Sequence, residues 1–463
     1  MSNRLKIRLH GVHVADLKQS PRTGRLSLRY VKSWLDNPAA YALSLRLPLK
    51  ASAYDDDYAA PFIAGLLPDS KLHRRLIGEA LGIGDTSEFR LLEAIGRECA
   101  GAVSVVPEDE PDAPELSIVP HFDLLDERQL AELIRNLPRR PLMIDQEDDV
   151  RLSLAGVNDK AAVVRSGGRI GLPKGNTPST HILKTDIPRL PDSVRTENFC
   201  LKLAREVGIR TPRSTIETAE DQVYMLVSRY DRKLIASKDG PRLQRLHQED
   251  LCQALGYSPD FKYERDGGPN WKLCFELLDA SARREYTTHR AMPRATRALD
   301  RPDLLNLAMF QWVVGNPDAH AKNYSLILTP DRASLAPAYD LNNAAAFRDM
   351  YKSVRPRMAM SIGGVFHPDE LSGENWDQFA RETGFSPSVV RQALSDMASR
   401  VPDLASTLAS SMRGTPAWSD RIVDVVDDIA ARCASVPGML AGRQSKPKED
   451  ASGVLDLSEG PLS

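Results

Sequence analysis

The segment from Pro302 to Val314 is apolar on nearly every side of a helical projection, and it sets the strongest limit on the architecture. A helix of this kind has no face for water, so many other elements must enclose it in a core. Proline suits the first helical position and Gly315 ends the pattern, so the sequence predicts a helix over 302–314. A polar loop follows, and then an apolar strand over 325–328. The chain therefore presents this loop from a rigid support, where catalytic groups are usually held.

The polar loop contains Asp318 and Asn323, five positions apart. Protein kinases use the same interval in their catalytic loop, where the Asp accepts the proton of the substrate hydroxyl and the Asn holds Mg²⁺. Downstream, an apolar stretch ends at Asp340, which is a candidate for the second Mg²⁺ ligand. Its triplet is Asp-Leu-Asn, only a partial match to the kinase Asp-Phe-Gly. By itself the interval is common in proteins, and it more often reflects Asp and Asn side chains that cap a loop.

A possible phosphate-binding lysine precedes this loop in the chain. Lys184 ends an apolar strand over 180–184, and Glu197 follows thirteen residues later in a helix predicted over about 193–207. A lysine at a strand end is more often simply solvated. The order of the parts is more informative, because Lys184, Glu197, Asp318, Asn323 and Asp340 follow one another as the corresponding parts do in kinases.

Two further segments are candidates for nucleotide contacts. The apolar strand over 222–229 runs into Tyr230 and Asp231, which we interpret as an aromatic ring for stacking on adenine and a polar contact. A buried strand with a capped end is an equally good interpretation. The segment 151–160 stands where a loop around the phosphates is expected, and Ser153 and Lys160 could contact them. It has a single glycine, so it matches neither common phosphate-binding motif.

Other chemistries are less well supported. Asp318, His320 and Asp340 could hold a catalytic metal, but there is no second histidine cluster. The Gly-x-Ser-x-Gly turn of serine hydrolases is absent. The five cysteines are scattered without a Cys-x-x-Cys pair, which argues against disulfides and thiolate zinc. The net charge of −2 gives no general attraction to nucleic acid or anionic membranes, and no apolar run reaches 18 residues. We expect a soluble, cytoplasmic protein without a membrane partner.

The chain of 463 residues divides into segments of different character. Alternating apolar residues before position 30 predict a small antiparallel sheet, and helices are expected over 58–82 and 87–97. The predicted divisions are an N-terminal α/β module over 1–107, a linker and helix over 108–150, a β-rich part over 151–240, a helical part over 241–440, and a disordered tail over 441–463.

Several segments together resemble one family, the HipA toxin kinases of bacterial toxin–antitoxin pairs. Gln-Glu-Asp-Leu-Cys-Gln over 248–253 and Asp-Ala-His-Ala-Lys-Asn over 318–323 form a highly specific combination. The similarity covers roughly residues 3–440. The other segments that carry it are Leu45–Leu49, Leu66–Ser70, Gly96–Val103, Ser153–Lys160, Thr180–Lys184 and Tyr339–Asp340.

The resemblance implies an α+β, two-lobed, protein-kinase-like fold, with a β-rich N-lobe, an extra N-terminal α/β subdomain and an all-helical C-lobe. It implies a serine/threonine kinase that uses ATP and Mg²⁺, with Asp318 as the base, His320 and Tyr339 lining the nucleotide site, and Ser153 as the site of an inhibitory autophosphorylation. The chain departs from the best-known member at Ser228 and Tyr230, which leaves side-chain contacts from Ser228 to the nucleotide open.

The resemblance also implies partners. Typical members phosphorylate an aminoacyl-tRNA synthetase, usually the glutamyl enzyme, and so stop translation. A separately encoded HipB-like helix-turn-helix antitoxin binds the kinase and the operator DNA. Two alternatives stay open: a nucleotide-binding pseudokinase that acts mainly as a co-repressor, and a small-molecule kinase of the aminoglycoside type. The second leaves the N-terminal motifs unexplained.

Overall fold

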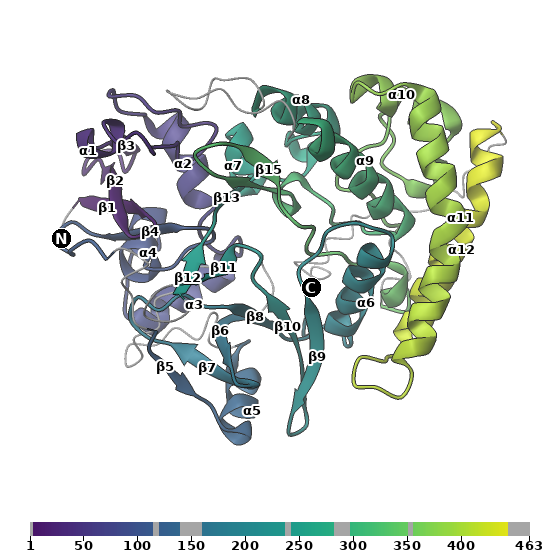
Figure 1. The fold of residues 1–463 in the computed structure, drawn as a ribbon, viewed down its shortest axis with the longest axis horizontal. Helices are drawn as coiled ribbons and strands as arrows, with labels where there is room; N and C mark the ends of the chain where they lie inside the picture. Colours follow the sequence, from purple (N-terminus) through teal and green to yellow (C-terminus); the bar gives the residue numbers. More distant parts are fainter. Residues whose placement is uncertain are drawn as a thin grey trace.

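The computed structural model describes residues 3–113, 120–138, 160–236, 242–281, 297–350 and 355–442. Ser153, the predicted site of autophosphorylation, and nearly all of the predicted tail over 441–463 lie outside the described residues. Three parts surround a central region: an N-terminal subdomain, an N-lobe built on a sheet, and a helical C-lobe (Figure 1). No helix in the described part of the chain is long and apolar enough to cross a membrane.

The N-terminal subdomain is built on a four-stranded antiparallel sheet with strand order β3-β2-β1-β4. The predicted alternation is present, because Leu5, Ile7 and Leu9 are fully buried. The helical region expected over 58–82 forms two helices separated at the Leu-Leu-Pro-Asp-Ser segment. The elements are β1 (Arg4–Leu9), β2 (Val12–Gln19), β3 (Leu26–Tyr30), α1 (Lys32–Leu35), α2 (Asp56–Ala64), α3 (Lys71–Leu81), α4 (Glu88–Ile95) and β4 (Val103–Pro107).

The N-lobe is a six-stranded antiparallel sheet with strand order β5-β7-β6-β8-β10-β9. One face packs on α5 (Glu127–Asn136) through residues such as Leu226, while the neighbouring Met225 and Val227 face the main core, with α6 (Ser193–Glu206). The segment predicted as linker and helix thus supplies β5 and α5 to this lobe. The strands are β5 (Phe122–Leu124), β6 (Lys160–Ser166), β7 (Arg169–Pro173), β8 (His181–Lys184), β9 (Ser214–Ala219) and β10 (Gln222–Ser228).

A hairpin of β11 (Arg232–Ile235) and β12 (Arg242–Arg245) leads from the N-lobe to the C-lobe. The helices α11 (Pro387–Met412) and α12 (Arg421–Leu440) form the outer edge of the C-lobe and pack against α6 (Figure 1). The other helices are α7 (Leu251–Leu255), α8 (Trp271–Ser281), α9 (Arg297–Val313) and α10 (Gly373–Glu382), with short 3-10 turns η3 (Pro259–Phe261), η4 (Glu264–Asp266), η6 (Ala321–Asn323), η7 (Ala345–Phe347) and η8 (Pro368–Glu370).

Two expectations for the C-lobe need correction. The lobe is not all-helical, because β13 (His247–Asp250), β14 (Ser325–Leu328) and β15 (Ala333–Leu335) form a small antiparallel sheet. The predicted buried helix is present as α9, but it begins at Arg297, so Pro302 lies inside the helix and not at its first position. Residues of α9 from Leu304 to Val313 pack into the core, as the apolar pattern predicted.

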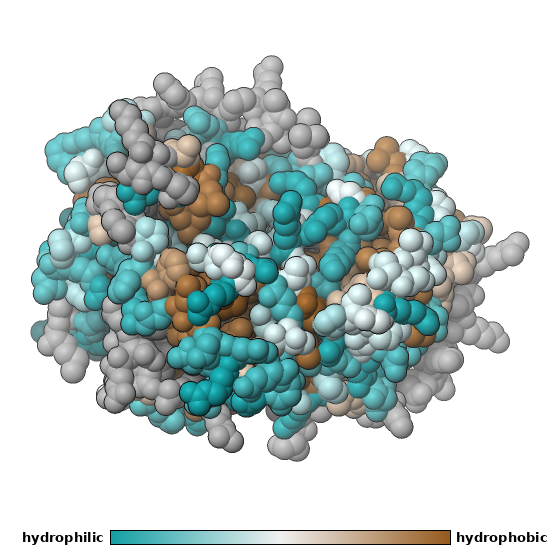
Figure 2. All heavy atoms as spheres, turned by 60° about the horizontal axis from the view of Figure 1, so that its bottom comes forward, coloured by the Kyte–Doolittle hydropathy of each residue, from teal (hydrophilic) through white to brown (hydrophobic). Residues whose placement is uncertain are grey.

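The outer surface is mixed. Figure 2 shows a face on which hydrophilic side chains cover most of the area and hydrophobic ones gather mainly in recesses between them. Such a face is consistent with the near-neutral charge of the whole chain, in which 61 basic residues are balanced by 63 acidic ones.

Candidate active site

All three parts of the structure contribute to one cleft. Its walls include Asp69 of the N-terminal subdomain, Lys184 of the N-lobe and Asp318 of the C-lobe. Every described residue that the sequence singled out lines this cleft. They are Lys160, Lys184, Glu197, Ser228, Tyr230, Asp231, Asp318, His320, Asn323, Tyr339 and Asp340.

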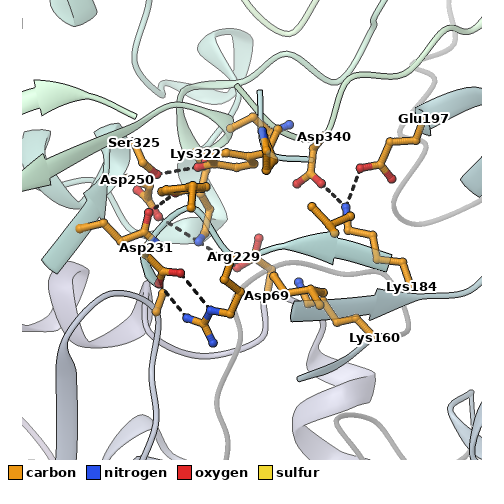
Figure 3. A pocket seen from close by; sticks show the side chains of 18 of the residues that line it. Asp69, Lys160, Lys184, Glu197, Arg229, Asp231, Asp250, Lys322, Ser325 and Asp340 are labelled. Carbon is orange, nitrogen blue, oxygen red and sulfur yellow. Dashed lines mark hydrogen bonds and ion pairs between the residues drawn. The ribbon is translucent and has the colours of Figure 1, made fainter. Parts of the chain in front are cut away.

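Lys184 sits at the end of β8 between two carboxylates (Figure 3). Its Nζ lies 2.7 Å from Oε1 of Glu197, on α6, and 2.5 Å from Oδ1 of Asp340. Burial alone would lower the pKa of Lys184, but Asp340 and Glu197 outweigh it and raise that pKa. Burial raises the pKa of Glu197. At Asp340 burial acts in the same direction, but the charge of Lys184 outweighs it, so the pKa of Asp340 is lowered. The lysine therefore stays charged inside the cleft.

Asp340 is held in an unusual backbone conformation. Its φ is +52°, in the left-handed region that non-glycine residues rarely adopt. The Asn316 amide donates to its backbone carbonyl at 3.2 Å, while its side chain is 36% exposed to the cleft. Strained backbone of this kind persists where its surroundings fix it, often at functional sites. Here it directs a carboxylate toward Lys184.

The loop after α9 presents Asp318 in a fixed geometry. Asn316 accepts a hydrogen bond from the Asp318 backbone N–H at 3.1 Å, and the Asn323 amide donates to the Asp318 carbonyl at 2.7 Å. The two residues of the predicted interval thus contact each other across the loop, as the capping interpretation also required. The Asp318 carboxylate still lines the cleft, so capping and a chemical role are compatible.

The side chains of Asn323 and Asp340 fit a magnesium site. Both line the same cleft, and each has an oxygen of the kind that Mg²⁺ prefers. Protein Mg²⁺ sites usually take one or two such groups and fill the other positions with waters and substrate phosphates. Within the described residues, no group of three or more His, Cys, Asp or Glu side chains could hold a metal by itself.

Beside these charged groups in the cleft, the ring of Tyr230 stacks on the ring of Tyr339, with centroids 5.8 Å apart and planes 17° apart. The two rings form an aromatic wall suited to a planar base. Tyr339 is fixed in turn by Ser325, with 2.6 Å between their hydroxyl oxygens. The Ser228 hydroxyl lies 3.2 Å from Nε2 of His181, on the neighbouring strand.

The Asp231 carboxylate has a structural role that the sequence did not predict. It forms ion pairs with Arg229 at 2.7 Å and Arg232 at 2.9 Å, and it accepts from the backbone N–H of Gly101 at 2.8 Å. Glu98 of the N-terminal subdomain joins the same buried cluster, 2.6 Å from Arg232. These contacts occupy the side chain that was expected to contact adenine, and they tie the N-terminal subdomain to the segment beside Tyr230.

His320 is neutral and buried. Burial, reinforced by the charge of Lys262, lowers the pKa of His320 to about 3. Its Nε2 lies 3.7 Å from Oδ1 of Asp318, too far for a hydrogen bond. His320 therefore shapes the cleft beside the Asp318 carboxylate without giving it a positive neighbour.

The sequence did not point to several charged residues of the cleft, among them Lys322, Asp250 and Asp69. Lys322 Nζ lies 3.0 Å from Oδ2 of Asp250 and 3.5 Å from Oδ1 of Asp69. The signal was present, because Leu-Leu-Pro-Asp-Ser and Gln-Glu-Asp were among the segments that carried the resemblance. Spacing along the chain gave no reason to join them to the loop at 318–323. Another missed residue, Tyr263, contacts Asp318 directly.

Comparison with known proteins agrees with this arrangement. The family model described as the HipA N-terminal domain matches residues 5–106, and that of the HipA-like C-terminal domain matches residues 152–405, more than half of the chain. The chain belongs to the HipA family. The resemblance stated from the sequence is therefore confirmed.

Two relatives match this HipA-family chain over most of its length. The protein Y4mE of Sinorhizobium fredii is 34% identical over 420 residues, covering 90% of this chain and 94% of that protein. The serine/threonine-protein kinase toxin HipA of Shewanella oneidensis is 28% identical, covering 86% and 87%. HipA in its complex with HipB and operator DNA, from the same organism, has a similar structure, with a TM-score of 0.77, 25% identity and coverage of 94% and 98%. The two-lobed kinase-like fold is confirmed as well.

Proposed function

We propose that this protein is a serine/threonine kinase toxin that transfers the γ-phosphate of ATP to a hydroxyl of a protein substrate. The observation that carries the proposal is the convergence of Lys184, Glu197 and Asp340 with Asp318 and Asn323 in one cleft. These groups come from three regions of the chain, and together they supply the parts that phosphoryl transfer needs.

Each residue has a distinct task in this proposal. Asp318 accepts the proton of the incoming hydroxyl, and Lys184, held by Glu197, binds the phosphates. Asn323 and Asp340 would hold Mg²⁺, which neutralises phosphate charge during transfer. When the phosphates arrive, Lys184 exchanges part of its contact with Asp340 for phosphate oxygens, and this frees the carboxylate. Lys160 lies close enough to Asp340 for their charges to interact, so it adds a further cation on the phosphate side.

The aromatic part of the cleft, formed by Tyr230 and Tyr339, would select the nucleotide. Tyr230 and Tyr339 would stack with adenine, and backbone groups near Ser228 and Asp231 would hydrogen-bond its edge. We also propose that Ser153, which precedes Lys160 in the sequence, is autophosphorylated. A phosphoserine carries nearly two negative charges into a site suited to ATP phosphates, so it would oppose ATP binding.

The biological role we propose follows the relatives. The toxin name of the Shewanella oneidensis relative and its complex with HipB and operator DNA support a growth-arresting kinase in the cytoplasm, held by a HipB-like antitoxin that contacts DNA. An aminoacyl-tRNA synthetase, such as the glutamyl enzyme, is the substrate we propose. The net charge of −2 agrees with DNA contact made mainly through the antitoxin.

The test is phosphate transfer from labelled ATP with Mg²⁺. Fresh, dephosphorylated protein should label itself at Ser153, and Asp318→Ala should abolish this labelling. A matched control, Asp403→Ala, removes an exposed aspartate on α11 and should label normally. Labelling by Asp318→Ala at the normal rate would remove Asp318 from its role.

The alternative function, a nucleotide-binding pseudokinase that serves as co-repressor, predicts a different result. It predicts ATP binding without label on Ser153 or on any synthetase. Brief induction of the chain followed by phosphoproteomics extends the test to the substrate. New phosphorylation on a synthetase supports the proposal, and none on any protein favours the co-repressor.

A further inference from the structure

A tyrosine outside the catalytic loop contacts the proposed base. The Tyr263 hydroxyl donates a hydrogen bond to Oδ1 of Asp318 at 2.6 Å. This distance is typical of a strong hydrogen bond from a hydroxyl to an ionised oxygen. Tyr263 precedes Asp318 by 55 residues and lies between η3 and η4, in the connection from α7 to α8.

The segment around Tyr263 is fixed to the C-lobe. Glu264 accepts hydrogen bonds from the backbone N–H of Ser361 at 2.6 Å and from its hydroxyl at 2.8 Å, and its own N–H donates to Ala359 at 3.2 Å. The N–H of Gly268 donates to the Tyr263 carbonyl at 2.9 Å. A Cβ at Gly268 would stand 2.7 Å from that carbonyl oxygen, so this close approach requires glycine.

The Tyr263 ring is held as well as its backbone. It meets His320 edge to face, with ring centres 5.2 Å apart and planes at 79°, and Lys262 Nζ lies 5.3 Å from the ring centre. Because backbone and ring are both fixed, the hydroxyl has little freedom to follow Asp318 elsewhere. The hydrogen bond therefore limits the orientation of the carboxylate.

We propose that Tyr263 is a positioning residue for proton transfer, which holds Oδ1 of Asp318 and so limits the orientations that the carboxylate can present to the hydroxyl of the substrate. The proposal rests on the kinase function proposed above. The terminal torsion of an aspartate is broad, so an unheld carboxylate would sample many orientations.

Among the described residues, His320 and Tyr324 also lie near Asp318. His320 is neutral, and its ring nitrogen is 3.7 Å away, too far for a hydrogen bond. The Asp318 charge acts on Tyr324, which is fully buried. Charged groups in the described part of the chain that act on His320, or on which His320 acts, are Lys262, Lys322, Asp69 and Asp340.

The experiment compares Tyr263→Phe with Tyr224→Phe. Tyr224 also donates to a carboxylate, Glu217 at 3.0 Å, but it lies on β10 outside the cleft lining, so it controls for the loss of such a hydrogen bond. For Tyr263→Phe we expect kcat to fall roughly 10- to 100-fold, less than full loss of a general base would cost. We expect KM for ATP to stay within about twofold, because the hydrogen bond acts on the base and not on nucleotide binding. Tyr224→Phe should change neither.

A double-mutant cycle separates positioning from folding. Because Asp318→Ala has no transfer left to measure, the cycle is read in the free energy of unfolding: in the Asp318→Ala background Tyr263→Phe should cause no further loss, since the partner is gone. Replacement of Tyr263 by 3-fluorotyrosine keeps its shape and its hydroxyl, so kcat should stay close to that of the wild type, and a loss as large as that of Tyr263→Phe would contradict the role of the hydroxyl. This second variant keeps the proposal testable if the phenylalanine variant folds poorly.

The outcomes distinguish the two proposals. If the wild-type protein transfers no phosphate, the kinase function fails. If the wild type is active while Tyr263→Phe keeps its kcat, the positioning role is wrong. An equal loss of unfolding free energy in the wild-type and Asp318→Ala backgrounds would also overturn it, since that pattern indicates a structural effect.

Discussion

Oδ1 of Asp69, in the N-terminal subdomain, lies 3.5 Å from Nζ of Lys322, in the loop that carries Asp318. Lys262 approaches the other oxygen of Asp69 at 3.8 Å. The subdomain thus reaches the centre of the cleft and supplies one of its charges. A separately functioning N-terminal domain would not be expected to place a carboxylate beside the loop that carries Asp318. We therefore regard the N-terminal subdomain, the N-lobe and the C-lobe as one functional unit.

Asp69→Asn should therefore lower stability. Burial would raise the pKa of Asp69, but Lys322 and Lys262 outweigh it and lower that pKa. The ionised Asp69 therefore stabilises the fold at pH values above the pKa of this residue in the unfolded chain, near 4. This contribution is lost as the pH falls through the lower pKa that Asp69 has in the folded protein. Because Asp250 still pairs with Lys322, we expect a loss of about 2 kcal/mol at pH 7, less than for a pair left without any partner.

Urea unfolding at pH 7 measures this effect, with Asp403→Asn as an exposed control on α11. Unchanged stability of Asp69→Asn would show that Lys322 needs only Asp250. Transfer activity measured in parallel shows whether the contact also orders the loop at 318–323.

Lys184→Met should remove the cation between two carboxylates. Glu197 and Asp340 would then face each other without it, and the pKa of each should rise. We expect kcat/KM for phosphate transfer to fall roughly 100- to 1000-fold, the usual cost of losing a charge-stabilising group. Steady-state kinetics checks this, with Lys202→Met on the same helix as Glu197 serving as control, since Lys202 lies outside the cleft lining. A fall of similar size in both variants would point to damage to α6.

Glu249 should make stability depend on pH near neutrality. Burial raises its pKa to about 8, and it accepts from the Leu45 N–H at 2.8 Å. In the folded state Glu249 therefore keeps its proton up to about pH 8, whereas in the unfolded state it loses that proton above about pH 4.5. The contribution of Glu249 to the free energy of unfolding is complete below about pH 4.5 and falls as the pH rises toward 8.

Glu249→Gln should remove this dependence and raise stability at pH 8 by about 3 kcal/mol. Urea unfolding from pH 5 to 9 measures both proteins. Glu132→Gln, exposed on α5, should leave the wild-type slope in place. If Glu249→Gln kept the wild-type slope, Glu249 would have to be ionised in the folded protein.

Local sequence patterns predicted many of the helices and strands, whereas the features that they missed depend on contacts between residues far apart in the chain. The strand at 181–184 and the helix at 193–206 lie close to the predicted strand over 180–184 and helix over 193–207, because both depend on nearby residues. The predicted start of α9 was wrong: the helix begins before Pro302, and Arg301 in this part of it pairs with Asp279 of α8. In the small C-lobe sheet, β13 pairs with β14, which follows it far along the chain, and no local period reveals such pairing. Asp69 and Tyr263 were missed for the same reason.

Gly315 shows how one backbone position supports the catalytic loop. Its φ is +67°, and a Cβ there would lie 2.8 Å from Oδ2 of Asp428 and 3.1 Å from the amide of Asn343. Asp428 is buried and pairs with Arg348 and Arg432, so it has little room to move. Gly315→Ala should combine backbone strain with crowding, and we expect a stability loss of about 2–3 kcal/mol.

Gly414 offers a matched control for this change. Its φ is +75°, but a Cβ there would meet nothing within 4 Å, so Gly414→Ala should cost only the strain, about 1 kcal/mol. The difference in unfolding free energy between the two variants isolates the crowding beside Asp428. Because Gly315 lies three residues before Asp318, its variant should also lose transfer activity, whereas Gly414→Ala should keep it. Equal stability losses together with full activity in Gly315→Ala would show that the loop adapts, and that Asn316 and Asn323 hold Asp318 without help from the turn.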